Sequence, residues 1–165
     1  MVNLAIWLDG VILDIDLTDH LYNQYKGMSL STLPVSYSVN KDWSEVNKYL
    51  SIYDMAILSP YDKFTTEDVI SRIRLEPKYV IYNQGKTKPS PEPYKLLFSL
   101  TKWDPLDVVT ICSSPLDLLS ARFYDSRIKI VCVKRNRDCS KYSPFIYSED
   151  LLKVYFSLKR LKILQ

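Results

Sequence analysis

The sequence lacks any apolar run of about eighteen residues, the length that a transmembrane helix needs. Its first ten residues, MVNLAIWLDG, contain neither the positively charged segment nor the small-residue cleavage site of a secretory signal. Because both targeting features are missing, we expect no contact with membranes and a cytoplasmic protein.

Cysteine is also scarce, with three residues in the chain. Their spacing fits neither a disulfide framework nor a metal-binding CxxC pattern. Cys112 and Cys132 lie in apolar runs, so we expect them to be buried as small apolar side chains. Cys139 is expected to be a thiol in a loop.

Apolar residues are plentiful, at 47% of 165 residues. A chain of this length buries roughly two-thirds of its unfolded surface in one compact domain and is too short for two. The sequence contains no internal repeat, low-complexity tract or linker. We therefore predict a single domain over residues 1–165.

The net charge is only +3, but residues 120–165 hold 11 Lys and Arg against 4 Asp and Glu. Cations interleaved with aromatic residues are typical of nucleic-acid surfaces, so nucleic-acid binding is one candidate function. These cations lie partly in a predicted strand and partly in a loop, and a solvated face is the simpler interpretation. The residues are Arg127, Lys129, Lys134, Arg135, Arg137 and Lys141, with Tyr142, Phe145 and Tyr147.

Short apolar runs alternate with amphipathic stretches, the pattern of helices packed on a mostly parallel sheet. Five strands are predicted, at 3–8, 54–59, 78–83, 107–112 and 127–133. Helices are predicted at 42–53, at 65–75 with a threonine cap, from Pro91 or Pro93 onwards, at 115–125, and at 148–164 with Ser148 as cap. Residues 16–40 are predicted to be a loop with room for one short element.

The order of these segments resembles the haloacid dehalogenase superfamily, whose members are mostly phosphatases and phosphotransferases. The resemblance spans residues 3–133 and is strongest in KPSPEPYKLLFSLTKWDPLDVVTICSSPLDLLSARFYDSRIKIVCV, which follows the family pattern without a gap. It implies a three-layer α/β/α sandwich with a five-stranded, mostly parallel, Rossmann-like sheet. Because about 50 residues separate Asp9 from Ser59, we expect no cap domain or a minimal one.

The first family motif is Asp-x-Asp-Gly, in which the first Asp attacks phosphorus and the second protonates the leaving group. The segment LDGVILD matches its right-hand part. The resemblance therefore assigns Asp9 to the acid/base position and Trp7 to the nucleophile position. We expect the indole of Trp7 to fill the phosphate pocket, with its N–H reaching Ser59, Ser113 or a backbone carbonyl.

The other motifs imply binding positions. By resemblance, the Ser59 hydroxyl would bind a phosphoryl oxygen and Lys88 would neutralise the phosphoryl charge. In the family, two acids of the fourth motif hold magnesium, and here these positions are Ser113 and Asp117. Each residue also has a structural interpretation: Asp9 as a turn residue paired with Lys88, Ser59 as a cap, and Asp117 in a helix first turn.

Two carboxylate ligands of one ion are thus missing, since Trp7 offers no oxygen and Ser113 only a hydroxyl. We therefore predict that the domain has lost phosphatase activity, needs no cofactor, and binds a ligand or partner, either a small phosphorylated molecule or a protein. Asp9, Lys88, Ser59, Ser113 and Asp117 are the candidate site residues.

The chain can also be aligned with the first family motif in a second way, called the second register below. Asp14-x-Asp16-x-Thr18 also fits the first motif and would give an active, magnesium-dependent phosphohydrolase, although it lacks the usual glycine and leaves the strand at 3–8 without a role. The simpler interpretation of these aspartates, together with Asp19, is a solvated acidic loop.

Overall fold

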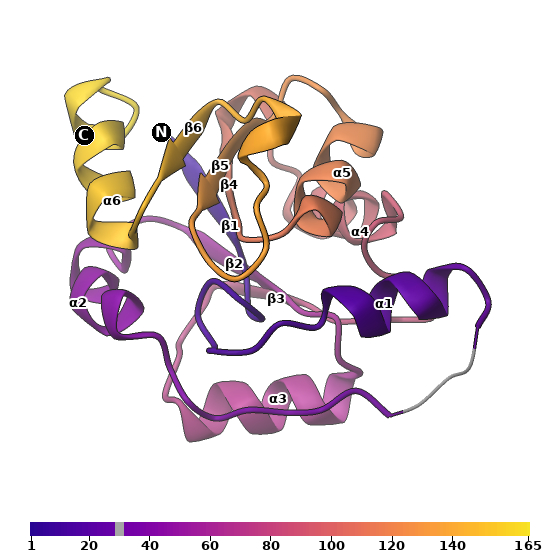
Figure 1. The fold of residues 1–165 in the computed structure, drawn as a ribbon. Coiled ribbons are helices and arrows are strands. Elements are labelled where there is room, and N and C mark those ends of the chain that lie inside the picture. Colours follow the sequence, from indigo (N-terminus) through magenta and orange to yellow (C-terminus); the bar gives the residue numbers. More distant parts are fainter. Residues whose placement is uncertain (29–31) are drawn as a thin grey trace.

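Six parallel strands form the sheet in a computed structural model, which describes residues 1–28 and 32–165 (Figure 1). The strand order is β3-β2-β1-β4-β5-β6. The strands are β1 (Asn3–Trp7), β2 (Met55–Leu58), β3 (Tyr79–Ile81), β4 (Val108–Cys112), β5 (Lys129–Val133) and β6 (Ile146–Ser148). The predicted Rossmann-like α/β class is confirmed, with β1 between β2 and β4.

The strand β6 is a correction to the predicted sheet of five. It contains only three residues, IYS, and the apolar run FIY at 145–147 is too short to mark a strand in the sequence. It forms because Ile146–Ser148 lie beside Val131–Val133 of β5 and complete their hydrogen bonding. Tertiary pairing therefore creates a strand that propensity alone does not predict.

Helices cover both faces of the sheet. They are α1 (Thr18–Tyr25), α2 (Lys41–Leu50), α3 (Lys63–Arg72), α4 (Glu92–Thr101), α5 (Pro115–Tyr124) and α6 (Leu151–Arg160), with short 3₁₀ turns at Pro105–Asp107 and Ser140–Tyr142. In Figure 1, α2 and α6 pack together on one side of the sheet and α4 and α5 on the other. No helix in the described ranges is both long and apolar enough to span a bilayer.

Two predicted helix caps were wrong. Asp62, not a threonine, caps α3 by accepting a hydrogen bond from the Thr65 N–H at 2.8 Å. Asp150 caps α6 in the same way, whereas Ser148 ends β6. A carboxylate accepts the free N–H groups of a first helical turn and also complements the helix dipole, which explains the preference for the acids.

Not every apolar side chain of the helices is buried, and Tyr49 of α2 and Leu100 of α4 are exposed. Leu97 is fully buried, but Leu100 is 55% exposed because Tyr94 and Phe98 supply the buried face of α4. All of Leu4–Trp7 is fully buried, as expected for a strand that has helices on both faces.

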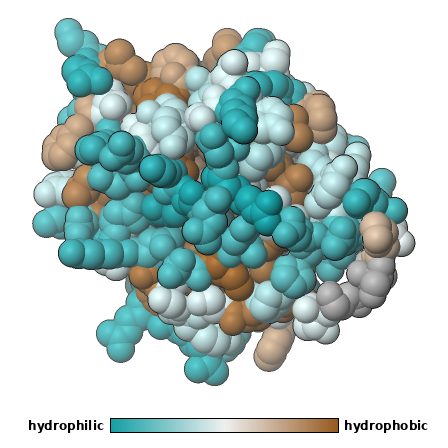
Figure 2. Space-filling view, in the orientation of Figure 1, coloured by the Kyte–Doolittle hydropathy of each residue, from teal (hydrophilic) through white to brown (hydrophobic). Residues whose placement is uncertain are grey.

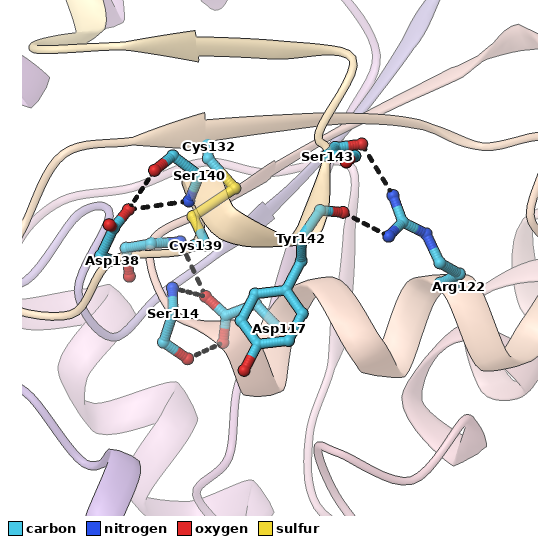
Figure 3. Close-up of a disulfide and its surroundings, with 10 residues drawn as sticks. Ser114, Asp117, Arg122, Cys132, Asp138, Cys139, Ser140, Tyr142 and Ser143 are labelled. Atoms are coloured by element: carbon cyan, nitrogen blue, oxygen red, sulfur yellow. Dashed lines mark hydrogen bonds between the residues drawn. A yellow bond between two sulfur atoms is a disulfide. The ribbon is translucent and has the colours of Figure 1, made fainter.

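The sequence-based expectation for the cysteines also needs correction. Cys132 at the end of β5 and Cys139 form a disulfide, with their Cα atoms 6.2 Å apart (Figure 3). The loop between them turns back over the strand, so two cysteines that are seven residues apart in the sequence meet in space. Cys112 remains a buried free thiol, as predicted.

Removing this disulfide should lower the free energy of unfolding by about 2 kcal/mol, the value expected for a closed loop of this length. The test is urea unfolding of the wild type and Cys139→Ser, each with and without reductant. Reductant should bring the wild type down to the stability of Cys139→Ser and leave the variant unchanged. A wild-type transition that reductant does not move would contradict the disulfide.

Candidate functional site

Three loops converge at the carboxyl ends of the central strands. Asp9 follows β1, Lys88 follows β3, and Asp117 lies in the first turn of α5 after β4. In parallel sheets these strand ends lie at one edge, where ligands bind in folds of this class. The structure therefore brings together three of the residues that the sequence analysis singled out.

The ammonium group of Lys88 lies between the two carboxylates. Its Nζ is 2.6 Å from Asp9 Oδ2 and 2.5 Å from Asp117 Oδ1. All three side chains are at most 5% exposed. Because water is excluded, these contacts are much stronger than surface ion pairs, and losing one partner would leave a charge buried.

Burial raises the pKa of Asp9 above its usual 3.8; the Lys88 ammonium opposes this rise and the Asp117 carboxylate adds to it. Burial by itself would lower the pKa of Lys88, but the two carboxylates outweigh it and hold the pKa above the usual 10.5. Lys88 is therefore a permanent cation, and Asp9 takes up a proton more readily than a free aspartate.

Asp9 has only one of its two oxygens in the cluster. Within the described residues, Asp9 Oδ1 is buried and has no hydrogen-bond partner. A buried carboxylate oxygen without a donor is costly, which agrees with the raised pKa of this group.

Trp7 closes the cluster from the side of β1. Lys88 Nζ lies 4.2 Å from the centre of its ring, a distance at which the ring face attracts a cation. The fully buried indole thus stands beside the cation, at the strand end where the resemblance places a nucleophile.

The predicted hydrogen-bond partners of Trp7 were wrong. Its Nε1–H donates to the hydroxyl of Tyr94 at 3.1 Å, not to a serine. Thr110 Oγ1 lies 2.6 Å from the same hydroxyl and donates to the Ala5 carbonyl, so the Tyr94 O–H donates to Thr110. This series of hydrogen bonds gives a partner to the Trp7 N–H and to the hydroxyls of Tyr94 and Thr110. Sequence analysis missed Tyr94 and Thr110 because their hydrogen-bond partners come from distant segments.

Asp117 combines the ion pair with a structural role. Its Oδ2 accepts hydrogen bonds from the backbone N–H groups of Ser113, at 2.9 Å, and Ser114, at 3.2 Å (Figure 3). The Ser114 hydroxyl and Asp117 form a capping box at the start of α5. Both oxygens of Asp117 are thus occupied by donors from the protein.

Ser59 is not part of the ion cluster. Its hydroxyl lies 2.8 Å from Thr66 Oγ1 and accepts a hydrogen bond from the Tyr61 N–H at 3.1 Å. The side chain is 2% exposed. In these contacts it caps the turn between β2 and α3, in line with its structural interpretation.

Two cavities adjoin the cluster, and the larger, of about 310 Å³, is lined by Lys88 and Thr87 on the side away from Ser113. The smaller, of about 40 Å³, lies next to Asp9 and Ser113, enough for roughly one or two water molecules. Gly10, with φ at +81°, approaches so closely that a Cβ there would lie 2.1 Å from Ser113 Oγ. The close approach of Gly10 to Ser113 narrows the smaller cavity beside Asp9.

The aspartates of the second register lie at the start of α1, not at the end of a sheet strand. Asp16 accepts hydrogen bonds from Thr18 at 2.6 Å and from Arg137 at 2.9 Å. Burial raises the pKa of Asp16, but these hydrogen bonds outweigh it and hold the pKa below its usual value. Asp14 is exposed.

Several cations of residues 120–165, the basic third of the chain, form hydrogen bonds or ion pairs with other residues of the protein. Arg135 forms two hydrogen bonds with Asp42 and also donates to the carbonyls of Gly10 and Val11. Arg137 pairs with Asp16 and Asp19, and Arg127 pairs with Asp125. These arginines hold loops in place. The ion-pair partners of Arg135 and Arg137 lie between 93 and 121 residues away in the sequence, so no local pattern could predict them.

No protein-family model matches the sequence, and no curated protein matches it significantly. Solved structures do match over nearly the whole chain. A haloacid dehalogenase-like family hydrolase from Streptococcus pneumoniae has a TM-score of 0.73 at 14% identity, covering 96% of this chain and 98% of its own. L-2-haloacid dehalogenase PA0810 has a TM-score of 0.74 at 15% identity, with coverages of 97% and 99%.

A hydrolase of the same superfamily, subfamily IA, from Geobacter sulfurreducens has a TM-score of 0.67 at 12% identity, with coverages of 96% and 100%. At these identities the likeness concerns the fold. The protein has the haloacid dehalogenase-like fold, as the resemblance predicted.

The residues at the strand ends do not fit the magnesium ion that the resemblance implies. Trp7 supplies no oxygen, and both oxygens of Asp117 accept hydrogen bonds from the protein. The Lys88 ammonium already lies between the two acids and pairs with both. Among the described residues, no group of three or more His, Cys, Asp or Glu side chains is arranged to hold a metal.

Replacing Lys88 should destabilise the fold strongly, because two buried carboxylates lose their counter-ion. Lys88→Met is expected to lower the free energy of unfolding by about 3–5 kcal/mol at neutral pH. Adding Asp9→Asn should recover part of that loss. The control is Lys95→Met on the exposed side of α4, with a change within about 0.5 kcal/mol. Equal stability of Lys88→Met and the control would show that the cluster is not buried as described.

The raised pKa of Asp9 predicts a pH dependence. Between 3.8 and the higher pKa of the folded state, the folded protein binds a proton that the unfolded chain has lost, so stability falls as pH rises. The stability of the wild type relative to Asp9→Asn should therefore decrease with increasing pH above 3.8. Denaturant unfolding at a series of pH values measures this difference, and an increase would refute the assignment.

Proposed function

We propose that the protein is a haloacid dehalogenase-fold domain without phosphoryl-transfer activity, which acts by binding a partner. The observation that carries this proposal is the closed ion cluster of Lys88, Asp9 and Asp117 under Trp7. A site that transfers a phosphoryl group needs a nucleophile and an available positive charge. Here the nucleophile position carries an indole and the cation is already paired.

The geometry of Asp9 supports the same conclusion. An acid/base carboxyl must reach the leaving group of a bound substrate. One oxygen of Asp9 is bound to Lys88, and the other is buried away from solvent. The cavity next to Asp9 is only about 40 Å³, which limits the access of an ester to this carboxyl.

An active phosphohydrolase that uses Asp14 and Asp16 remains the alternative. It is less favoured because Asp16 is held by Thr18 and Arg137, and because neither residue ends a strand of the sheet. Nucleic-acid binding by the basic third and a cytoplasmic location also stay predictions.

Phosphatase assays separate the first two functions. With a panel of phosphomonoesters and magnesium, we expect the wild type to give no turnover above the blank, and Asp14→Asn and Asp9→Asn to give the same result. Turnover that disappears in Asp14→Asn and persists in Asp9→Asn would establish the second register.

Calorimetric titration with magnesium tests the assignment of Trp7. We expect no binding to the wild type or to Trp7→Asp, because the ion still lacks a carboxylate at position 113. The double variant Trp7→Asp with Ser113→Asp should bind magnesium. Binding by the wild type and none by the double variant would show that Trp7 does not occupy the nucleophile position.

A further inference from the structure

The strand β6 is the last strand of the sheet, and its outer edge is not paired with another strand in the described part of the chain. Its inner edge pairs with β5, where the Phe145 N–H donates to the Ile130 carbonyl at 2.8 Å. Backbone N–H groups of a strand alternate in direction, so the N–H of Ile146 points outward. Such an edge can accept one more strand.

Two open grooves border the β6 segment, one beside α5 and the other beside α6, on opposite sides of the sheet. One, of about 350 Å³, lies at the start of β6 and is lined by Phe145 together with Arg122, Arg127 and Lys129. The other, of about 460 Å³, lies at the end of β6 and is lined by Tyr147, Phe156, Lys153 and Arg160. Exposed aromatic side chains and cations therefore occur together in each groove.

The charge of the grooves is positive. Arg127 pairs with Asp125, and Lys153 pairs with Glu149, at 2.8 and 3.4 Å. Arg122 donates to the carbonyls of Tyr142 and Ser143, as Figure 3 shows, and Lys129 donates to the carbonyl of Leu106. Arg122, Lys129 and Arg160 form no ion pair within the described residues, so each can attract an acidic group.

Building on the proposed binding function, we propose that the β6 edge binds an extended acidic segment of a partner protein, which adds to the sheet as a seventh strand. Its backbone would pair with the outward groups of β6. Because the side chains of an added strand alternate between the two faces of the sheet, acidic residues on one face would meet Lys129 and those on the other face Arg160. Its apolar residues would pack on Phe145, Tyr147 and Phe156.

Charge favours this occupant over a second copy of the chain. Pairing two β6 edges would bring Lys129 and Arg160 close to the same cations of the other copy. Figure 2 shows a face of the molecule on which hydrophilic residues dominate and apolar residues occur in separate groups. Nucleic acid could use the cations and aromatic rings, but it has no peptide backbone to pair with the strand.

The test measures the fluorescence anisotropy of a labelled peptide of three Glu-Glu-Val-Val repeats (the Glu–Val peptide), which presents both residue types on each face of a strand, with the full chain. We expect micromolar binding that weakens with salt, and no binding of the matching Lys–Val peptide. N-methylation of alternate residues of the Glu–Val peptide should weaken binding by at least about tenfold, because it removes the donors of strand pairing. This arm leaves the protein unchanged, so it does not depend on the folding of a variant.

The variant Lys129→Glu with Arg160→Glu should bind the peptide about tenfold less tightly, since two attractive charges become repulsive. Lys63→Glu with Lys95→Glu, the same charge change on α3 and α4, should bind like the wild type. Equal loss in both double variants, or equal binding of the N-methylated peptide, would overturn the proposal.

Other occupants give different results. Tighter binding of a labelled ten-nucleotide oligothymidine than of the Glu–Val peptide would assign the surface to nucleic acid. A dimer in sedimentation that fails to bind the peptide would assign the edge to a second copy. If the protein shows neither peptide binding nor phosphatase turnover, only the proposal for the β6 edge is refuted. If it shows both, only the proposed loss of catalysis is refuted.

Discussion

The contact of the Lys88 ammonium with the carboxylates of Asp9 and Asp117 joins three segments that are distant in the sequence. It connects the turn after β1, the loop after β3 and the first turn of α5. Two acids without this cation would repel each other in a region from which water is excluded. The arrangement of the loops at this edge of the sheet therefore depends on one charged group.

Trp7 makes this arrangement possible. An indole at the end of a central strand has one polar atom, and Tyr94 accepts its hydrogen bond. The donors then run in one direction through Tyr94 and Thr110 to the Ala5 carbonyl. Because each polar group has a partner, the largest side chain of β1 is buried beside a cation without an unsatisfied N–H.

A fold associated with hydrolases thus carries a strand-end site in which a buried ammonium is already paired with two carboxylates. The surface with unbalanced charge lies elsewhere, along β6, where Lys129 and Arg160 face solvent-accessible grooves. The strand-end cluster and the grooves beside β6 are separate regions of the molecule, and likeness of fold by itself assigns a function to neither.

Much of the fold follows from local sequence. The buried strands read as apolar runs because helices cover both of their faces, and this is why β1, β2, β4 and β5 could be predicted within one or two residues. The order of motifs also placed Asp9, Lys88 and Asp117 in the loops that meet at one edge. Sequence therefore determined the class of fold and the composition of the candidate site.

The tertiary structure decided which of these groups touch and what closes the site. The partner of the Trp7 N–H, the pairing of Cys132 with Cys139 and the strand β6 all depend on segments brought together by folding. Ser59 had the right position at a strand end, yet its hydroxyl turns to Thr66. Apolar periodicity and capping are properties of neighbouring residues, whereas hydrogen-bond and ion-pair partners depend on distances in space that a linear pattern does not contain.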